Sequence, residues 1–198
     1  MWKVTILSFP SLWSKLVTCT SISQSSMLTI VGRSGLHPLR VMIPCPALSD
    51  PPQDSIRYKH IDLVVKLLPR ISRLAFYTYG ERDTFRIYRA FKDRHANQLR
   101  QFSFTADPGL NKLFVLHSPQ LRSLCLYRVR SWPASVAENL THVQFDCPLD
   151  PETMAENLKL SPRLKQIRIS GNYRIHRRFR KYPKIPLAPG VRLIVAGS

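Results

Sequence analysis

The side chains best suited to binding chemistry lie in a basic, aromatic segment near the carboxyl end, YRIHRRFRKYPK at residues 173–184. Cations attract phosphates by releasing counterions, and aromatic rings stack on bases. The segment is compatible with nucleic-acid binding, which we place after two other interpretations: a basic cap over the end of the core, and a localisation or interaction tail. Its cations are Arg174, Arg177, Arg178, Arg180, Lys181 and Lys184.

Motifs of common enzymes are absent from the sequence. GRSGL at 32–36 departs from the G-x-S-x-G nucleophile motif because leucine stands at the last glycine position, and no P-loop or HExxH motif occurs. We considered His117, His142, Cys125 and Cys147 as metal ligands, but their spacing does not match a structural zinc pattern. We therefore expect no catalysis, no cofactor and no metal site.

The net charge of +18 is concentrated at the ends of the chain. All 12 acidic residues lie between Asp50 and Glu156, whereas residues 157–198 carry eleven Lys or Arg and the first 49 residues carry four. The hydrophobic fraction of 44% is typical of a folded domain and excludes a disordered chain.

Cysteine usage and hydropathy indicate the compartment. The four cysteines form no CxxC pair, which is typical of free thiols in a reducing compartment. No apolar run approaches the roughly 20 residues that cross a bilayer. The start resembles a signal peptide superficially, but Pro10 and Lys15 interrupt it. We expect an intracellular protein, cytoplasmic or nuclear, with no membrane partner.

The elements that would position any site follow from a recurring L-x-x-L-x-L spacing. Its intervals of 28, 22, 19 and 24 residues are close to the 20–29 residues of leucine-rich repeats. Looser copies occur at Leu39–Ile43 and Val191–Val195. The first positions of the five clear copies are Ile71, Leu99, Leu121, Leu140 and Leu164.

The spacing of the repeat has a physical reason. Positions four and six fall on one face of a strand, where side chains alternate, and only stacked neighbours can bury that face. Helical periodicity precedes several copies, at 56–71, 83–95 and 151–162, with Phe85, Tyr88 and Phe91 on one expected apolar face.

The predicted fold class is therefore α/β. We expect a leucine-rich-repeat solenoid of about six or seven units, with a curved parallel β-sheet and outer helices or turns. It should be irregular, because the asparagine usual at position nine of the repeat is present only as Asn172.

With the repeats aligned, the chain resembles fungal F-box proteins with leucine-rich repeats, particularly the basidiomycete class. WKVTILSFPSLWSKL at 2–16 is similar to the end of an F-box, and VGRSGLHPLRVMI at 31–43 resembles the element that follows it. SPQLRSLCLYRVRSWPASVAENLTHVQFD at 118–146 resembles a P-x-L-x-x-L-x-L repeat that leads into L-T-H-L. In that family the F-box binds a Skp-type adaptor of a cullin-RING ubiquitin ligase, and the repeats select protein substrates.

The resemblance implies three parts. Residues 1–16 would be a remnant of the F-box, residues 17–172 the repeat region, and residues 173–198 a basic extension with a terminal strand or cap. Because the first F-box helices are missing from the sequence, we expect a truncated receptor that reaches the adaptor only if an upstream F-box exists.

The expected partner site lies on the concave face of the solenoid. Tyrosine and arginine are common anchors of protein interfaces, and odd strand positions would face the concavity. The interpretation is a protein-interaction module of the substrate-recognition type. The alternatives are a nucleic-acid-binding protein that acts through the basic segment and a nonfunctional fragment. The candidate contacts are Arg73, Tyr77, Gln101, Tyr127, His142, Gln144 and Arg168.

Overall fold

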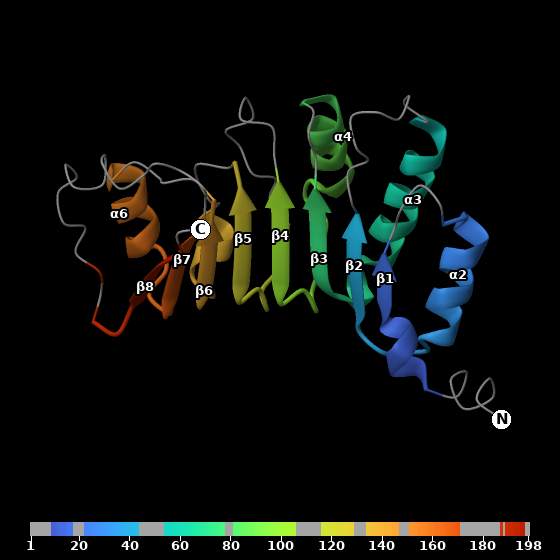
Figure 1. Cartoon of the computed structure of the whole chain (residues 1–198), viewed down its shortest axis with the longest axis horizontal. Helices are drawn as coiled ribbons and strands as arrows, with labels where there is room; N and C mark the ends of the chain where they lie inside the picture. Colours follow the sequence, from blue (N-terminus) through green and yellow to red (C-terminus); the bar gives the residue numbers. More distant parts are fainter. Residues whose placement is uncertain are drawn as a thin grey trace.

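The protein folds around one parallel β-sheet. The computed structural model describes residues 9–17, 22–43, 54–77, 81–105, 116–128, 134–146, 151–170, 187 and 189–196. Within these ranges eight strands pair in the order of the sequence, β1 to β8, and every pair is parallel (Figure 1). The predicted α/β class with a parallel sheet is confirmed.

Most of the described strands contain five residues. The strands are β1 (Lys15–Val17), β2 (Leu39–Ile43), β3 (Ile71–Tyr77), β4 (Gln101–Thr105), β5 (Ser123–Tyr127), β6 (His142–Phe145), β7 (Gln166–Ser170) and β8 (Arg192–Ala196).

Helices and short helical turns connect the strands within the described ranges. They are the 3₁₀ turns η1 (Pro10–Ser14) and η2 (Leu68–Arg70) and the helices α2 (Gln24–Arg33), α3 (Asp54–Leu67), α4 (Glu81–Phe91), α5 (Ala134–Ala137) and α6 (Pro151–Lys159).

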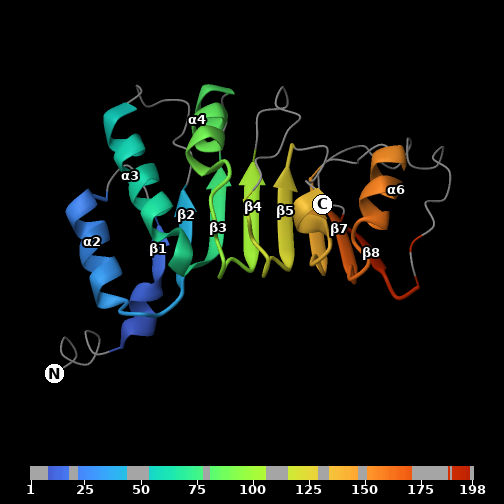
Figure 2. The same ribbon diagram turned by 180° about the vertical axis from the view of Figure 1, so that it is seen from behind.

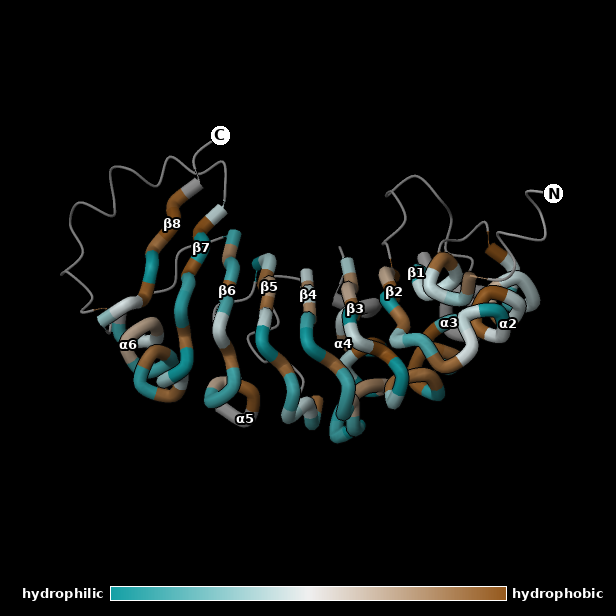
Figure 3. Tube along the Cα trace, turned by 90° about the horizontal axis from the view of Figure 1, so that it is seen from below, coloured by the Kyte–Doolittle hydropathy of each residue, from teal (hydrophilic) through white to brown (hydrophobic). Residues whose placement is uncertain are grey.

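The helices cover one face of the sheet and leave the other face open. Seen from behind, α2, α3, α4 and α6 stand in front of the strands (Figure 2). Seen along the strands, the sheet is an arc with the helices on its outer side (Figure 3). Parallel strands need crossover connections, and the helices described in these connections lie on the convex face. Among the described residues, no helix lies on the concave face.

The core lies between the sheet and the helices, as the repeat predicts. Positions one, four and six of all five clear copies are at most 5% exposed. Register partners stack along the sheet, for example Leu74 on Phe102 and Phe102 on Leu124. Phe76 contacts Phe91 of α4 edge-on, with ring centroids 4.8 Å apart, and so ties this helix to the sheet. Full burial of one such side chain stabilises the fold by about 1.5–3 kcal/mol.

A recurring turn feeds each central strand. The N–H of position one donates to the carbonyl three residues earlier, from Leu99 to Ala96 at 3.0 Å and from Leu140 to Ala137 at 3.1 Å. The accepting residue is buried each time, as Leu68, Ala96, Ser118, Ala137 or Ser161. Position two then bonds to position two of the preceding repeat, as in Arg122 N–H to the Arg100 carbonyl at 2.9 Å. These two bonds set the register before the strands begin.

One helix presents a different face from the expected one. Phe85 of α4 is 55% exposed, whereas Thr84, Ile87 and Phe91 are at most 4% exposed. At about 100° per residue, residues 84, 87 and 91 lie within about 60° of one another around the helix axis. Residues 85, 88 and 91 span about 120°, so they do not share one narrow face. Phe85 stacks on Tyr88 instead, with centroids 6.5 Å apart. The prediction for Phe85 was wrong.

The first strand was not expected from the sequence. β1 pairs with β2 through Lys15 and Arg40, so it crosses the proposed boundary between residues 16 and 17. With β1 and β8 included, the described sheet has eight strands, where we expected six or seven units. No helix in the described part of the chain is both long and apolar enough to cross a membrane.

Candidate interaction surface

Side chains on the concave face form rows that run across the strands. Because the strands are in register, each row takes one residue from each strand. The entry row, at the start of the strands, is Lys15, Arg40, Arg73, Gln101, Ser123, His142, Gln166 and Arg192. The middle row, from β2 to β8, is Met42, Ala75, Ser103, Cys125, Gln144, Arg168 and Ile194.

All seven candidate contact residues lie on strands β3 to β7 at these concave positions. Arg73, Gln101 and His142 belong to the entry row, and Gln144 and Arg168 are register partners in the middle row. Tyr77 and Tyr127 flank Thr105 near the other end of the strands. Arg73, His142 and Arg168 are exposed, and the other four are half-buried. The six cations of the basic segment lie outside the described residues.

Hydrogen bonds fix the centre of the middle row. Gln144 Nε2 donates to Ser170 Oγ at 3.0 Å and to the Tyr127 hydroxyl at 3.3 Å. Ser170 Oγ in turn donates to the Phe145 carbonyl at 3.3 Å. The amide of Gln144 is therefore held in one orientation, with its carbonyl oxygen still available to a partner.

Cys125 and Tyr127 on the concave face both have a raised pKa. Burial raises the pKa of the Cys125 thiol, and its hydrogen bond with Ser103 and the charge of Arg168 offset this only in part. Burial, followed by the proximity of Cys125 and Tyr77, raises the pKa of Tyr127. A thiol or phenol with a raised pKa is protonated and a weak nucleophile at neutral pH.

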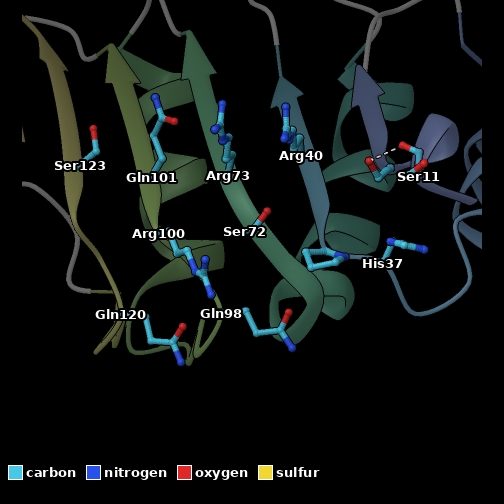
Figure 4. A pocket seen from close by; sticks show the side chains of 12 residues that line it. Ser11, His37, Arg40, Ser72, Arg73, Gln98, Arg100, Gln101, Gln120 and Ser123 are labelled. Atoms are coloured by element: carbon cyan, nitrogen blue, oxygen red, sulfur yellow. Dashed lines mark hydrogen bonds between the residues drawn. The ribbon is translucent and has the colours of Figure 1, made fainter.

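A polar hollow of about 740 Å³ lies at the amino-terminal ends of β2 to β5. Its side chains come from the strands and from the turns that precede them (Figure 4). Three of them are arginines, and no carboxylate lines the hollow among the residues that the structure describes. We call it the first hollow; it is lined by Ser11, Ser14, His37, Pro38, Arg40, Ser72, Arg73, Gln98, Arg100, Gln101, Gln120 and Ser123.

Backbone and side-chain bonds hold the walls of the first hollow. Ser72 Oγ donates to the Leu39 carbonyl at 3.1 Å, which links β3 to β2. The guanidinium of Arg70 donates to Ser34 Oγ at 2.9 Å and to the Gly35 carbonyl. Gly35 has a φ of 54°, a left-handed conformation that glycine adopts at little cost. This turn places His37 and Pro38 at the rim.

A second hollow of about 790 Å³ lies at the amino-terminal ends of β6 to β8. Arg122 Nη1 donates to the Asn139 carbonyl at 3.2 Å, and Arg163 Nη1 donates to Asn139 Oδ1 at 3.1 Å. Within the described part of the chain, four Arg or Lys side chains and no carboxylate line the second hollow. It is lined by Arg122, Thr141, His142, Pro162, Arg163, Leu164, Lys165, Gln166, Pro189, Gly190 and Arg192.

The two hollows are functional candidates that our sequence reasoning missed. It assigned contacts to strand positions only, whereas Arg100, Arg122 and Lys165 occupy position two of their repeats and still line the hollows. A signal was present in the sequence, because the residue after the first leucine is basic in LRQF, LRSL and LKQI.

The residues considered as metal ligands do not gather in the described part of the chain. His117 stacks on His95 in the turns before β5 and β4, with ring centroids 4.9 Å apart. No group of three His, Cys, Asp or Glu side chains converges among the described residues, and Cys147 lies outside them.

Comparison with known proteins gives no match. No family model, no curated protein and no solved structure matches the chain significantly.

Proposed function

We propose that this chain is a protein-interaction module, built as an irregular leucine-rich-repeat solenoid and similar to the substrate-recognition part of an F-box ubiquitin ligase subunit. The observation that carries the proposal is the open concave face, where strands in register present rows of polar side chains. Solenoids of stacked repeats use such extended concave surfaces for binding.

The chemistry of the face favours recognition over catalysis. It offers arginine, glutamine, histidine and tyrosine, side chains that hydrogen-bond a partner and cover apolar surface. Backbone pairing fixes the strands that carry them, so little backbone entropy is lost when a partner docks. In the ligase interpretation the chain would only hold the substrate, and partner subunits would transfer ubiquitin.

Site-specific crosslinking tests the interaction proposal. A photo-crosslinking amino acid at Ser103 stands in the middle row of the concave face, and the matched control stands at the exposed Asp62 on α3 of the convex face. We expect protein adducts from the Ser103 position in cells and few from the Asp62 position. Equal adducts from both faces, or none from Ser103, would contradict the proposal.

The ligase link needs its own test. The natural gene product, expressed from its own transcript with an affinity tag, should retain a Skp-type adaptor and a cullin on purification. Loss of both subunits from a clean preparation would refute the ligase link and leave the interaction module standing.

A further inference from the structure

We propose that the first and second hollows form one continuous anion-binding track, which receives an extended acidic polypeptide segment with two anionic groups about seven residues apart. This inference rests on the proposed protein-interaction function and names the class of substrate. We call the combined lining of the two hollows the cationic track.

The first argument is charge. Arg40, Arg73 and Arg100 line the first hollow, and the second adds four further cations. Asp93 and Glu138 are described acidic residues that precede lining residues closely in the sequence. They lie in the turns before β4 and β6, and neither of them lines a hollow. The track therefore presents uncompensated positive charge to one side of the molecule, which attracts and orients an anionic partner.

The second argument is continuity. Ser123 in the first hollow and His142 in the second are register partners on β5 and β6. The Arg122 N–H donates to the Arg100 carbonyl at 2.9 Å, which joins a lining residue of the second hollow to one of the first. The two hollows therefore meet at neighbouring strands, where one extended ligand can contact both.

The third argument concerns the kind of ligand. Glutamine, serine and threonine side chains alternate with the cations, and these groups can pair with the N–H and C=O groups of an extended peptide. Single-stranded nucleic acids rely on aromatic platforms on which bases stack. Among the described residues, the two hollows contain one imidazole each, His37 and His142, and no phenylalanine, tyrosine or tryptophan. The lining therefore favours an acidic polypeptide over a nucleic acid.

The fourth argument gives the spacing of the anionic groups. Arg73 on β3 and Arg192 on β8 occupy the same row, five strand steps apart. At about 4.8 Å per strand the row spans about 24 Å, which an extended polypeptide covers in about seven residues.

The test measures binding of labelled synthetic peptides by fluorescence anisotropy. One peptide carries two Glu-Glu pairs about seven residues apart in a neutral Gly/Ser/Gln background, a second has the pairs about two residues apart, and a third has a single pair. We expect the first peptide to bind at least about tenfold more tightly than the other two, because only it engages both ends of the track. Equal affinity for all three would overturn the proposal.

Matched variants locate the binding. Arg73→Gln and Arg192→Gln should each abolish the preference for the widely spaced peptide. Arg89→Gln removes the same charge from an exposed position on α4 and should leave the preference unchanged. Circular dichroism and thermal unfolding show whether each variant is folded. If a folded Arg73→Gln variant keeps the preference, the proposal is wrong.

Two further arms separate the alternatives. Peptides with phosphoserine in place of glutamate show whether the anionic groups are carboxylates or phosphates, and tighter binding of either supports the track. Oligonucleotides of equal length that bind more tightly, and lose binding in Arg73→Gln, would overturn the peptide assignment. A variant with Arg177, Arg178, Arg180 and Lys181 changed to Gln tests the basic segment, and loss of peptide binding only there would also overturn it.

The outcomes distinguish the two proposals. Protein adducts at Ser103 without peptide binding would refute the cationic track and leave the interaction module standing. Specific peptide binding without adducts at Ser103 would support the track and refute the middle row as the docking surface.

Discussion

At the scale of the residue, the small side chain three positions before the first leucine of four repeats is a sensitive point. Ser118 and Ser161 are buried there, and their hydroxyls have no hydrogen-bond partner among the described residues, whereas Ala96 and Ala137 fill the same place. Ser118→Ala and Ser161→Ala should raise the free energy of unfolding by up to about 1 kcal/mol, because a buried unpaired hydroxyl is removed. Urea denaturation measures the change.

The reverse substitutions are the matched control. Ala96→Ser and Ala137→Ser should each lower the free energy of unfolding by about 1–2 kcal/mol, since each buries a new hydroxyl. If both Ser→Ala variants were less stable than the parent, the hydroxyls would have to be bonded in solution.

His60 makes the stability depend on pH. This histidine of α3 is 4% exposed, and burial lowers its pKa below the ordinary value of 6.5. The unfolded chain then binds a proton at this histidine more readily than the folded chain does. The free energy of unfolding is therefore highest, as far as His60 is concerned, above about pH 7, and it decreases as the pH falls below 6.5.

The prediction for His60 is checked by urea denaturation at pH 7.5 and at pH 5. The parent protein should lose more stability between these two values than His60→Leu, which cannot titrate. Equal losses in the two proteins would mean that His60 contributes nothing to the pH dependence.

At the scale of the element, α4 shows how a helix chooses its buried face. Ile87→Ala should lower the free energy of unfolding by about 2–5 kcal/mol, because a fully packed aliphatic side chain is lost. Phe85→Ser, two positions away, should change it by less than about 0.5 kcal/mol, since Phe85 is exposed. Thermal unfolding of both variants measures the contrast. A large loss of stability in Phe85→Ser would contradict this assignment of the buried face of α4.

The strands could be predicted from the sequence and parts of the surface could not. The L-x-x-L-x-L spacing determines which side chains enter the core, because alternation along a strand is a local property. β1 has only three residues and depends on pairing with β2, which no local pattern reveals. The leucine of this strand, Leu16, is not part of an L-x-x-L-x-L copy.

The hollows were missed for a different reason. Arg100 and Arg122 reach them from position two, where the direction of the side chain is set by the turn and by bonding to the neighbouring repeat. The buried face of α4 was missed because Phe85 is more apolar than Thr84, although Thr84 is the residue aligned with Ile87 and Phe91.

At the scale of the whole molecule, β8 is the last strand of the described sheet and pairs, among the described residues, with β7 alone. Leu193, Ile194 and Val195 of β8 are 48%, 41% and 53% exposed, and edge strands with exposed apolar residues pair with other chains. We expect association that increases with concentration, detected by light scattering. Ile194→Lys, on the concave side of this strand, should reduce it without lowering the melting temperature.

A matched change elsewhere controls for charge. Ser103→Lys, in the same row on the central β4, adds one positive charge away from the edge and should leave association nearly unchanged. Equal suppression by both variants would assign the effect to net charge.

Each described strand pairs only with its neighbours in the sequence, so the sheet grows by one strand for each repeat. Gain or loss of one repeat would shift the strands beyond it by about 4.8 Å and leave the other repeats unchanged. Recombination between repeats can therefore lengthen or shorten the concave face without any point substitution in it.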